Sequence, residues 1–201
     1  MVNRFPGFGQ EEMMDGMGHG SDSEAIVRSI RHPASFAVVF DRHFDAIHAY
    51  LQRRAGPDLA DELAAQTLAV AFDRRARYDP AHPDARPWLF GIATNLLARH
   101  RRQEIRQLRA FSKTGVDPVL DQLDGVEARL DASARRRELA ETLARLAPEE
   151  LDVLLLYAWA DLSYAEMAQA LEVPIGTVRS RLSRARGHVR ELLEPDRASS
   201  K

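Results

Sequence analysis

Apolar side chains recur every three or four residues in several long stretches of this sequence, and prolines or glycines separate the stretches. This spacing places the apolar groups on one face of an α-helix. The sequence therefore predicts an all-α fold. The first stretch begins at Ser35 and contains Phe36, Val39, Phe40, Phe44, Ile47, Tyr50 and Leu51.

Two further helices are predicted in the first half of the chain. Gly56-Pro57 ends the first helix, and a second is expected from about Asp58 to Arg77. The segment 78–84 contains two prolines, which resist helix formation at their own positions and at the preceding residues, so we expect a loop. Pro87 suits the first position of a helix that continues into a basic segment.

The pattern divides the 201 residues into two small helical domains with a flexible linker between them. Residues 1–23 lack periodicity and are predicted to be a disordered tail. Residues 24–110 are expected to form the first domain, 111–133 an acidic linker, 134–194 the second domain and 195–201 a frayed tail. We expect each domain to fold separately. The second should contain a helix with Leu139, Leu143 and Leu146 on its buried face, and another starting at Pro148.

Composition argues against several functional classes. The chain has no cysteine, which excludes disulfides, thiol catalysis and thiolate zinc sites. No apolar run approaches the length of a membrane span, and no signal peptide is recognisable, so we expect a cytoplasmic protein without membrane insertion. The seven histidines are scattered, and no phosphate loop, zinc-protease motif or nucleophile elbow occurs. We therefore expect neither an enzyme nor a metal or cofactor site.

The distribution of charge is more informative than the formal net charge of −2. Five arginines lie between positions 99 and 109, five more lie between 179 and 190, and acidic residues gather between 117 and 131. A chain with two basic segments can contact a polyanion twice in spite of a near-neutral total. Solvated helix faces would account equally well for the basic segments on charge alone.

Residues 161–192 favour DNA binding more specifically. Ser163 and Glu166 have the spacing of a capping box, which predicts the start of a short helix. A turn at residues 172–174 precedes a longer basic helix with a buried stripe from Val178 to Leu192. A short helix, a tight turn and a longer basic helix are typical of a helix-turn-helix motif.

Helical geometry predicts which residues of the basic helix face outward. At about 100° per residue, Ser180, Ser183, Arg184 and Gly187 lie opposite the buried stripe, and Arg179 and Arg190 flank them. Serine and glycine allow close approach to DNA, whereas arginine matches phosphate and guanine. This face can therefore enter a major groove.

Two parts of the sequence resemble the extracytoplasmic-function (ECF) group of bacterial RNA polymerase sigma factors. Residues 146–150 (LAPEE), 162–168 (LSYAEMA) and 174–186 (PIGTVRSRLSRAR) resemble region 4 of these proteins, and residues 86–102 (RPWLFGIATNLLARHRR) resemble region 2. The two matches occur in the family's order. The resemblance implies a non-enzymatic factor that directs core RNA polymerase to promoter DNA.

The resemblance also implies three sets of binding residues. The −35 duplex would contact the recognition helix through Thr177, Arg179, Ser180, Ser183, Arg184 and Arg190. The −10 element would be opened by the loop 78–86 and the following helix, through Arg86, Trp88, Asn95, Arg99, Arg101 and Arg102. Trp88 at the helix start favours a core position over a wedge between bases. Core polymerase would contact Asp58, Asp61, Glu62 and Gln66.

Two positions depart from the family pattern. The family commonly has glycine where this chain has Asp161 and Glu172, at turns suited to a left-handed backbone. Aspartate tolerates that conformation, whereas glutamate does so poorly. Either the turn at Glu172 is less tight in this protein, or the residue is strained.

Other interpretations remain open at this stage. The second domain alone could serve a stand-alone helix-turn-helix regulator, which would bind duplex DNA without polymerase. Many relatives are held inactive by an anti-sigma factor, so the resemblance adds such a factor as a further partner.

Overall fold

The computed structural model describes residues 20–113, 143 and 145–193, and these are helical apart from short connections. Within this part of the chain the prediction of an all-α fold is confirmed, and no helix is both long and apolar enough to cross a membrane. The elements in chain order are α1 (Asp22–Arg31), η1 (Pro33–Phe36), α2 (Ala37–Ala55), α3 (Pro57–Arg74), η2 (Arg75–Arg77), α4 (Arg86–Lys113), α6 (Pro148–Trp159), α7 (Tyr164–Ala170) and α8 (Ile175–Leu193).

Helix α1 lies partly where the disordered tail was expected. Ser21 accepts a hydrogen bond from the Glu24 backbone N–H, and the Glu24 carboxylate accepts one from the Ser21 N–H, which together form a capping box. The helix therefore begins at Asp22, and its buried side includes Ala25 and Ile26. The rest of the expected tail, residues 1–19, lies outside the described residues.

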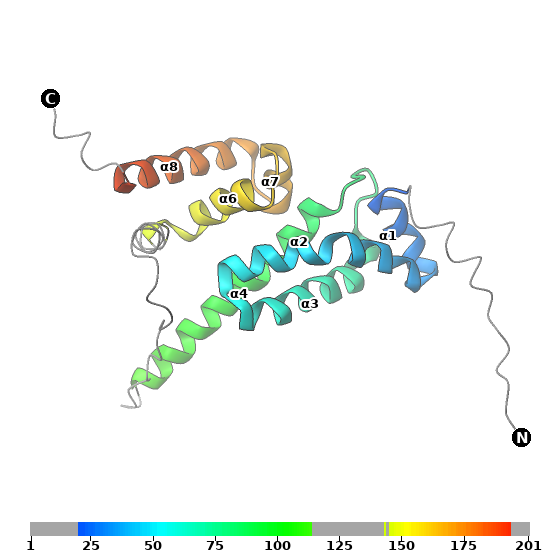
Figure 1. Cartoon of the computed structure of the whole chain (residues 1–201), viewed down its shortest axis with the longest axis horizontal. Coiled ribbons are helices and arrows are strands. Elements are labelled where there is room, and N and C mark those ends of the chain that lie inside the picture. The colour runs from blue at the N-terminus through cyan, green and yellow to red at the C-terminus, as the bar shows by residue number, and fades with distance from the viewer. Residues whose placement is uncertain (1–19, 114–142, 144, 194–201) are drawn as a thin grey trace, which may run out of the picture.

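Helices α2, α3 and α4 form the main body of the first unit, with α1 near the N-terminal end of α2 (Figure 1). The predicted apolar stripe of α2 is buried at Val39, Ile47, Tyr50 and Leu51. Phe90 of α4 packs edge-on against the Tyr50 ring at 5.3 Å. As expected, the segment between η2 and α4 is a loop.

Helices α6, α7 and α8 form the second unit. Its centre contains the fully or almost fully buried Val153, Leu156, Leu162, Met167 and Leu182. Most of the helix expected before α6 lies outside the described residues, but Leu143 is helical and Leu146 is buried in the turn before α6.

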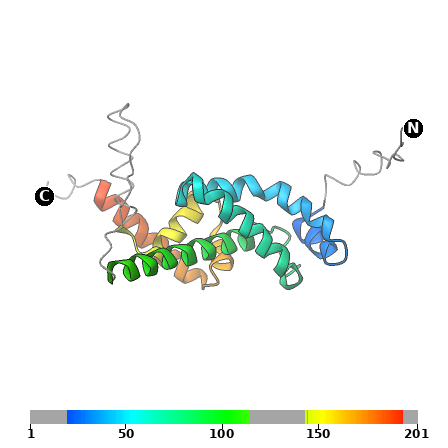
Figure 2. The same cartoon turned by 90° about the horizontal axis from the view of Figure 1, so that it is seen from below.

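The two units pack against each other, a contact that the sequence did not predict. Most of their buried apolar residues belong to one continuous cluster, and α7 lies against α4 (Figure 2). A side chain at Gly91 of α4 would place its Cβ 2.4 Å from the carbonyl oxygen of Ala170 in α7. The Arg54 guanidinium of α2 also contacts the Asp152 carboxylate of α6 at 2.6 Å.

Candidate nucleic-acid and polymerase interfaces

Helices α7 and α8 have the predicted helix-turn-helix arrangement. The capping box is present, because Ser163 Oγ accepts from the Glu166 N–H and the Glu166 carboxylate accepts from the Ser163 N–H. Val178, Leu182 and Ala185 of α8 are buried. The capped short helix and the buried stripe together fix which side of α8 faces solvent.

The turns around α7 contain two left-handed residues. Asp161 has φ 51° and Glu172 has φ 53°, and they are the only non-glycine residues with positive φ in the described part of the chain. This conformation brings Cβ close to the following carbonyl oxygen. Of the two alternatives for Glu172, the strained turn is the one observed.

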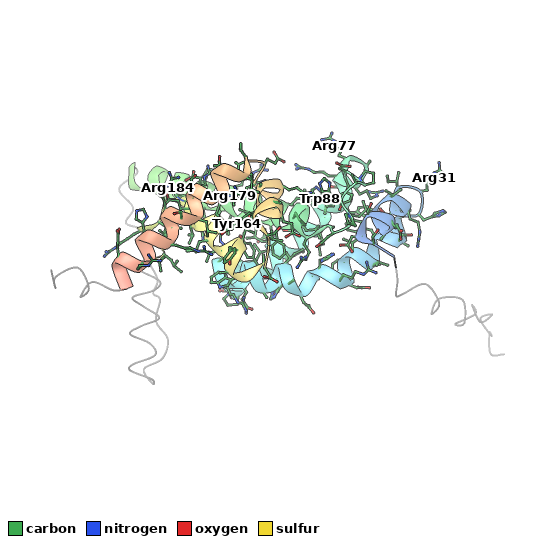
Figure 3. All side chains as sticks on the ribbon, turned by 90° about the horizontal axis from the view of Figure 1, so that it is seen from above. Arg31, Arg77, Trp88, Tyr164, Arg179 and Arg184 are labelled. Atoms are coloured by element: carbon green, nitrogen blue, oxygen red, sulfur yellow. The ribbon has the colours of Figure 1, made fainter. Side chains whose placement is uncertain are left out.

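The predicted −35 residues form most of the solvent-facing side of α8. Arg179, Ser180, Ser183, Arg184 and Arg190 are exposed, whereas Thr177 is half-buried near the helix start. Figure 3 shows Arg179 and Arg184 on this helix, with Tyr164 of α7 nearby. One side of α8 therefore presents several arginine guanidinium groups together with the hydroxyl groups of Ser180 and Ser183.

Arg184 lies closer to an acidic residue than the sequence indicated. Its Nε donates to the carboxylate of Glu150 at 2.8 Å, and His188 Nδ1 is 3.5 Å from the other oxygen of that carboxylate. Glu150 is buried, but the Arg184 side chain remains 60% exposed. Arg184 can therefore support the N-terminal turn of α6 while part of its guanidinium still faces solvent.

Sequence reasoning did not select Tyr157, Tyr164 and Arg186 as binding residues of this surface. Tyr164, Arg179, Ser183, Arg186 and Arg190 line one shallow hollow between α7 and α8. The Arg186 guanidinium lies 4.6 Å from the centre of the Tyr157 ring, which in turn lies 6.1 Å from that of Tyr164. Arg186 belonged to the second basic segment, but the two tyrosines carried no comparable sequence signal.

The predicted −10 residues divide between two sides of α4. Asn95, Arg99 and Arg102 are exposed and follow each other at helical spacing, so they form one outward stripe. Arg101 instead donates to the backbone carbonyl of Arg54 at 3.0 Å. Only part of the predicted set therefore shares a face.

Arg86 and Trp88 lie where α4 begins. Arg86 donates to the Asp84 carboxylate at 2.9 Å and lies 3.8 Å from the carboxylate of Glu166 in α7. Trp88 is half-buried, with its ring 4.9 Å from that of Tyr78. Trp88 is thus a supporting residue under the loop, with one part of its indole exposed.

The loop before α4 is organised around Tyr78. The buried phenol donates to the carbonyl oxygens of His82 and Asp84, at 2.7 and 3.2 Å. Burial, together with the nearby carboxylates of Asp22, Asp84 and Asp79, raises the pKa of Tyr78 to about 12. The phenol therefore stays neutral and holds the loop in one shape.

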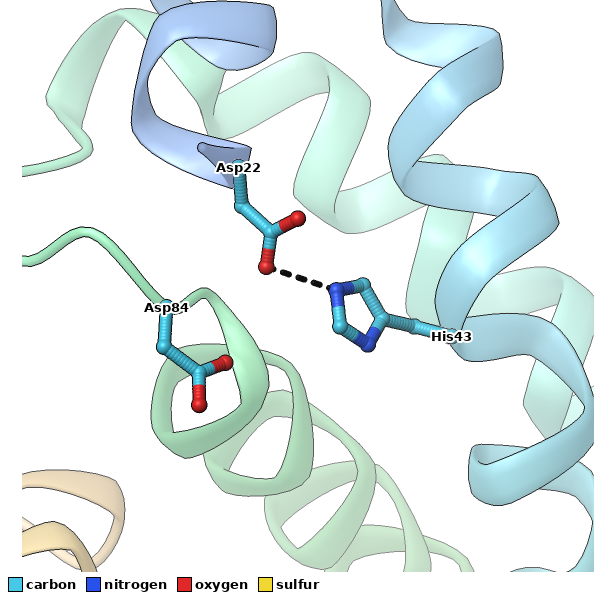
Figure 4. Close-up of side chains that lie close together, drawn as sticks. All are labelled: Asp22, His43 and Asp84. Atoms are coloured by element: carbon cyan, nitrogen blue, oxygen red, sulfur yellow. Dashed lines mark hydrogen bonds and ion pairs between the residues drawn. The ribbon is translucent and has the colours of Figure 1, made fainter. Parts of the chain in front are cut away.

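Asp22, His43 and Asp84 form the one group of metal-ligand types among the described residues, with candidate ligand atoms within 4.8 Å of one another (Figure 4). Asp22 accepts hydrogen bonds from Arg42, from His43 Nε2 at 2.7 Å and from the Ala85 N–H at 3.0 Å. Asp84 accepts from the backbone and side chain of Arg86. These hydrogen bonds join α1, α2 and the loop before α4, so a structural role explains why the three side chains lie close together.

The carboxylate of Asp22 is strongly stabilised in its charged form. Burial alone would raise its pKa, but the hydrogen bonds from His43, Ala85 and Arg42 and the interaction with the His43 ring outweigh burial. Together they hold the pKa of Asp22 well below its usual range.

The predicted polymerase-binding residues share the exposed side of α3. Asp58, Asp61, Glu62 and Gln66 are all exposed. His48 Nε2 bonds to Asp61 at 2.8 Å, and Gln66 donates to Glu62 at 2.9 Å. Glu62 and Gln66 also line a hollow with Arg99 of α4, so the structure brings two sets together that the sequence treated separately.

Two family models match separate segments of the chain, one in each helical unit. Residues 39–107 match the family model described as Sigma-70 region 2, and residues 136–189 match the model described as Sigma-70, region 4. The chain is 30% identical to the RNA polymerase sigma factor HrpL of Pseudomonas syringae pv. syringae, over 82% of this chain and 92% of that protein. It is 32% identical to the ECF RNA polymerase sigma factor SigC of Mycobacterium tuberculosis, over 68% of this chain and 71% of that protein.

Solved structures share the fold. The sigma factor RpoE of Bartonella quintana, crystallised with the anti-sigma factor NepR, superposes with a TM-score of 0.61 at 23% identity, covering 80% of this chain and 98% of that one. CnrH, in complex with the cytosolic domain of CnrY, gives a TM-score of 0.60 at 23% identity, covering 87% of this chain and 98% of that one.

Proposed function

Because this chain belongs to the ECF group of bacterial RNA polymerase sigma factors, we propose that the exposed faces of α3, α4 and α8 bind core polymerase, the −10 element and the −35 element respectively. The alternative of a stand-alone regulator is not favoured, because it leaves the region 2 match without a role. The observation that carries the assignment is the coexistence of three exposed faces of suitable chemistry in the order of the family.

The α8 face is suited to duplex DNA. Arg179, Arg186 and Arg190 lie beside Ser183 and Tyr164 in one hollow, which supplies charge-assisted donors to phosphate and polar groups for base edges. We propose that Arg179, Ser180, Ser183 and Arg184 read bases and that Arg186 and Arg190 bind the backbone.

The α4 face is suited to a single strand. Asn95, Arg99 and Arg102 form a track for phosphates. The rigid loop held by Tyr78 gives this unit a fixed surface against which a base outside the stack can bind. We propose that Trp88 supports this surface and does not insert between bases.

The α3 face carries carboxylates and an amide, which suit a basic partner surface on core polymerase. We propose that Glu62 and Gln66 are central to this contact, because Asp61 is partly engaged by His48. The protein then acts by binding, without catalytic chemistry of its own, in the cytoplasm where polymerase and promoters occur.

An anti-sigma factor is proposed as a further partner. The RpoE structure contains one, and here α2 and α3 enclose an open groove of about 500 Å³ lined by apolar groups that include Phe36, Phe40, Leu68 and Phe72. Phe40 is 43% exposed. A groove of this kind fits the apolar side of a partner helix.

Polymerase-dependent promoter binding tests the proposal. We expect Arg179→Ala to reduce promoter-complex formation by the reconstituted holoenzyme at least tenfold, with unchanged affinity for core polymerase. Arg145→Ala is the matched control, because Arg145 is exposed on the same unit but lies outside the α8 face. Equal losses for both variants, or tight specific DNA binding without polymerase, would contradict the assignment.

A further inference from the structure

We propose that Glu150 is a positioning residue for DNA recognition, which holds the Arg184 guanidinium in the orientation that reads a guanine in the −35 element. The inference rests on the proposed function, which assigns the exposed face of α8 to the −35 duplex. Glu150 itself belongs to α6 and is buried, so it acts on DNA only through Arg184.

Glu150 is fixed at the start of α6. It is the third residue of that helix, which begins at Pro148, and its backbone N–H donates to the carbonyl oxygen of Ala147 at 3.0 Å. A carboxylate in the first turn of a helix is stabilised by the partial positive charge of the unpaired N–H groups. The Glu150 side chain is only 9% exposed. Its carboxylate is therefore presented to α8 from a rigid and largely dry position.

Helix α8 brings two nitrogen-containing side chains to this carboxylate. Arg184 and His188 are four residues apart, so they lie on one side of the helix. Arg184 Nε donates to Oε1 of Glu150 at 2.8 Å, whereas His188 Nδ1 lies 3.5 Å from Oε2. Oε2 is buried and has no hydrogen-bond partner in the described part of the chain. Arg184 thus supplies the hydrogen bond that this carboxylate makes.

The atom that Arg184 uses for this bond decides what its guanidinium can still do. The group has five N–H donors, and Glu150 accepts from the one on Nε. The two terminal amino groups make no hydrogen bond or ion pair with the described residues, and the side chain is 60% exposed. Two such amino groups form the fork that matches O6 and N7 of guanine in the major groove. The bond at Nε therefore leaves the guanine-binding edge free and sets its direction.

Holding Arg184 in advance lowers the cost of reading a base. A free arginine side chain populates many rotamers and loses that freedom when it binds. The bond to Glu150 removes part of this freedom before DNA arrives, whereas a buried ion pair adds little net stability to a fold. The fixed direction favours the paired acceptors of guanine over a contact with phosphate, which carries no sequence information. Glu150 thus acts on base preference more than on overall affinity.

Selection of promoter DNA by the reconstituted holoenzyme tests the role of Glu150. The probe is a library of promoter duplexes with a randomised −35 region, and sequencing of the bound fraction gives the base preference at each position. We expect one position at which the parent prefers guanine at least tenfold and Arg184→Ala loses that preference. Glu150→Met, which keeps the volume of the side chain and removes both oxygens, should lower the preference at least threefold at this position alone.

Three further variants separate the hydrogen bond from other effects. Glu150→Gln keeps an oxygen acceptor for Arg184 Nε and should keep at least half of the parent's preference. Glu149→Met is the matched control, because it makes the same kind of change at the neighbouring exposed carboxylate, and it should match the parent. In the Arg184→Ala background, Glu150→Met should change the preference no further, since a positioning residue acts only through the side chain that it holds.

The measured quantity is a ratio between bases in one sample, so a smaller folded fraction of a variant leaves it unchanged. A Glu150→Met variant with the parent's guanine preference, or with preferences lowered alike at every −35 position, would overturn the positioning role. A glutamine variant no better than the methionine variant would overturn the hydrogen bond as its cause. If Arg184→Ala leaves the preference unchanged at every position, the base-reading role of Arg184 in the proposed function fails, and the role of Glu150 falls with it.

Discussion

Single residues in this protein often serve the fold and a binding surface together. Arg184 faces solvent and also neutralises the buried Glu150, and Arg86 begins α4 while contacting Asp84 and Glu166. Substitution of either residue therefore changes packing as well as charge. Residues whose role is confined to the backbone or to a buried cluster, such as Glu172 and Asp22, give cleaner tests of the physical account.

Replacement of Glu172 tests the strain in the turn between α7 and α8. We expect Glu172→Gly to be more stable than Glu172→Ala by about 1 kcal/mol, because only glycine adopts a positive φ without a Cβ clash. At Asp161 the gain in stability of the glycine variant over the parent should be smaller than at Glu172, since aspartate tolerates this backbone. Urea denaturation measures these values, and an alanine variant as stable as the glycine variant would refute the strain.

The Asp22 cluster predicts a dependence of stability on acid. The folded-state pKa of Asp22 lies below the unfolded value of about 3.9, so its stabilisation is complete above that value and is lost as the pH falls through the folded-state pKa. Asp22→Asn should cost about 2 kcal/mol at pH 7 and flatten the decline in the free energy of unfolding below pH 4. Asp41→Asn, at an exposed site, should leave both unchanged.

At the scale of elements, α3 and α4 each have one side buried in the core and another side that presents polar or charged groups to solvent. Helix α4 buries Leu89, Ala93 and Leu97, approaches α7 at Gly91, and leaves the stripe of Asn95, Arg99 and Arg102 exposed. Helix α3 buries Leu63 and Leu68 and exposes its carboxylates. The hollow between α3 and α4 lies where the proposed polymerase and −10 faces meet.

Charge reversal on α3 tests the polymerase contact. We expect Glu62→Lys to weaken binding to core polymerase at least tenfold, because a lysine would repel the basic partner surface that the α3 carboxylates fit. Asp41→Lys makes the same change at an exposed site on α2 and should bind normally. Fluorescence anisotropy with core polymerase gives both affinities. If the two variants bind equally well, the contact does not lie on this face.

At the scale of the whole molecule, the elements were more predictable than their contacts. Periodicity, prolines and the Ser163–Glu166 capping box placed α2, α3, α4, α6, α7 and α8, because these signals are local. Helix α1 was missed, since its short apolar pattern follows a segment without periodicity and its capping box was not recognised. The pairing of Arg184 with Glu150 and the approach of Gly91 to Ala170 depend on tertiary packing, which spacing within one helix does not encode.

Transcription in a purified system tests the central claim most directly. Core polymerase would be incubated with fragmented genomic DNA from the organism that encodes this chain, with and without the protein, and the transcript 5′ ends sequenced. The account predicts a defined set of start sites that requires the protein, shares one −35 and one −10 sequence, and is depleted in Arg179→Ala. The same start sites from core polymerase alone, or no new start sites with the protein present, would contradict it.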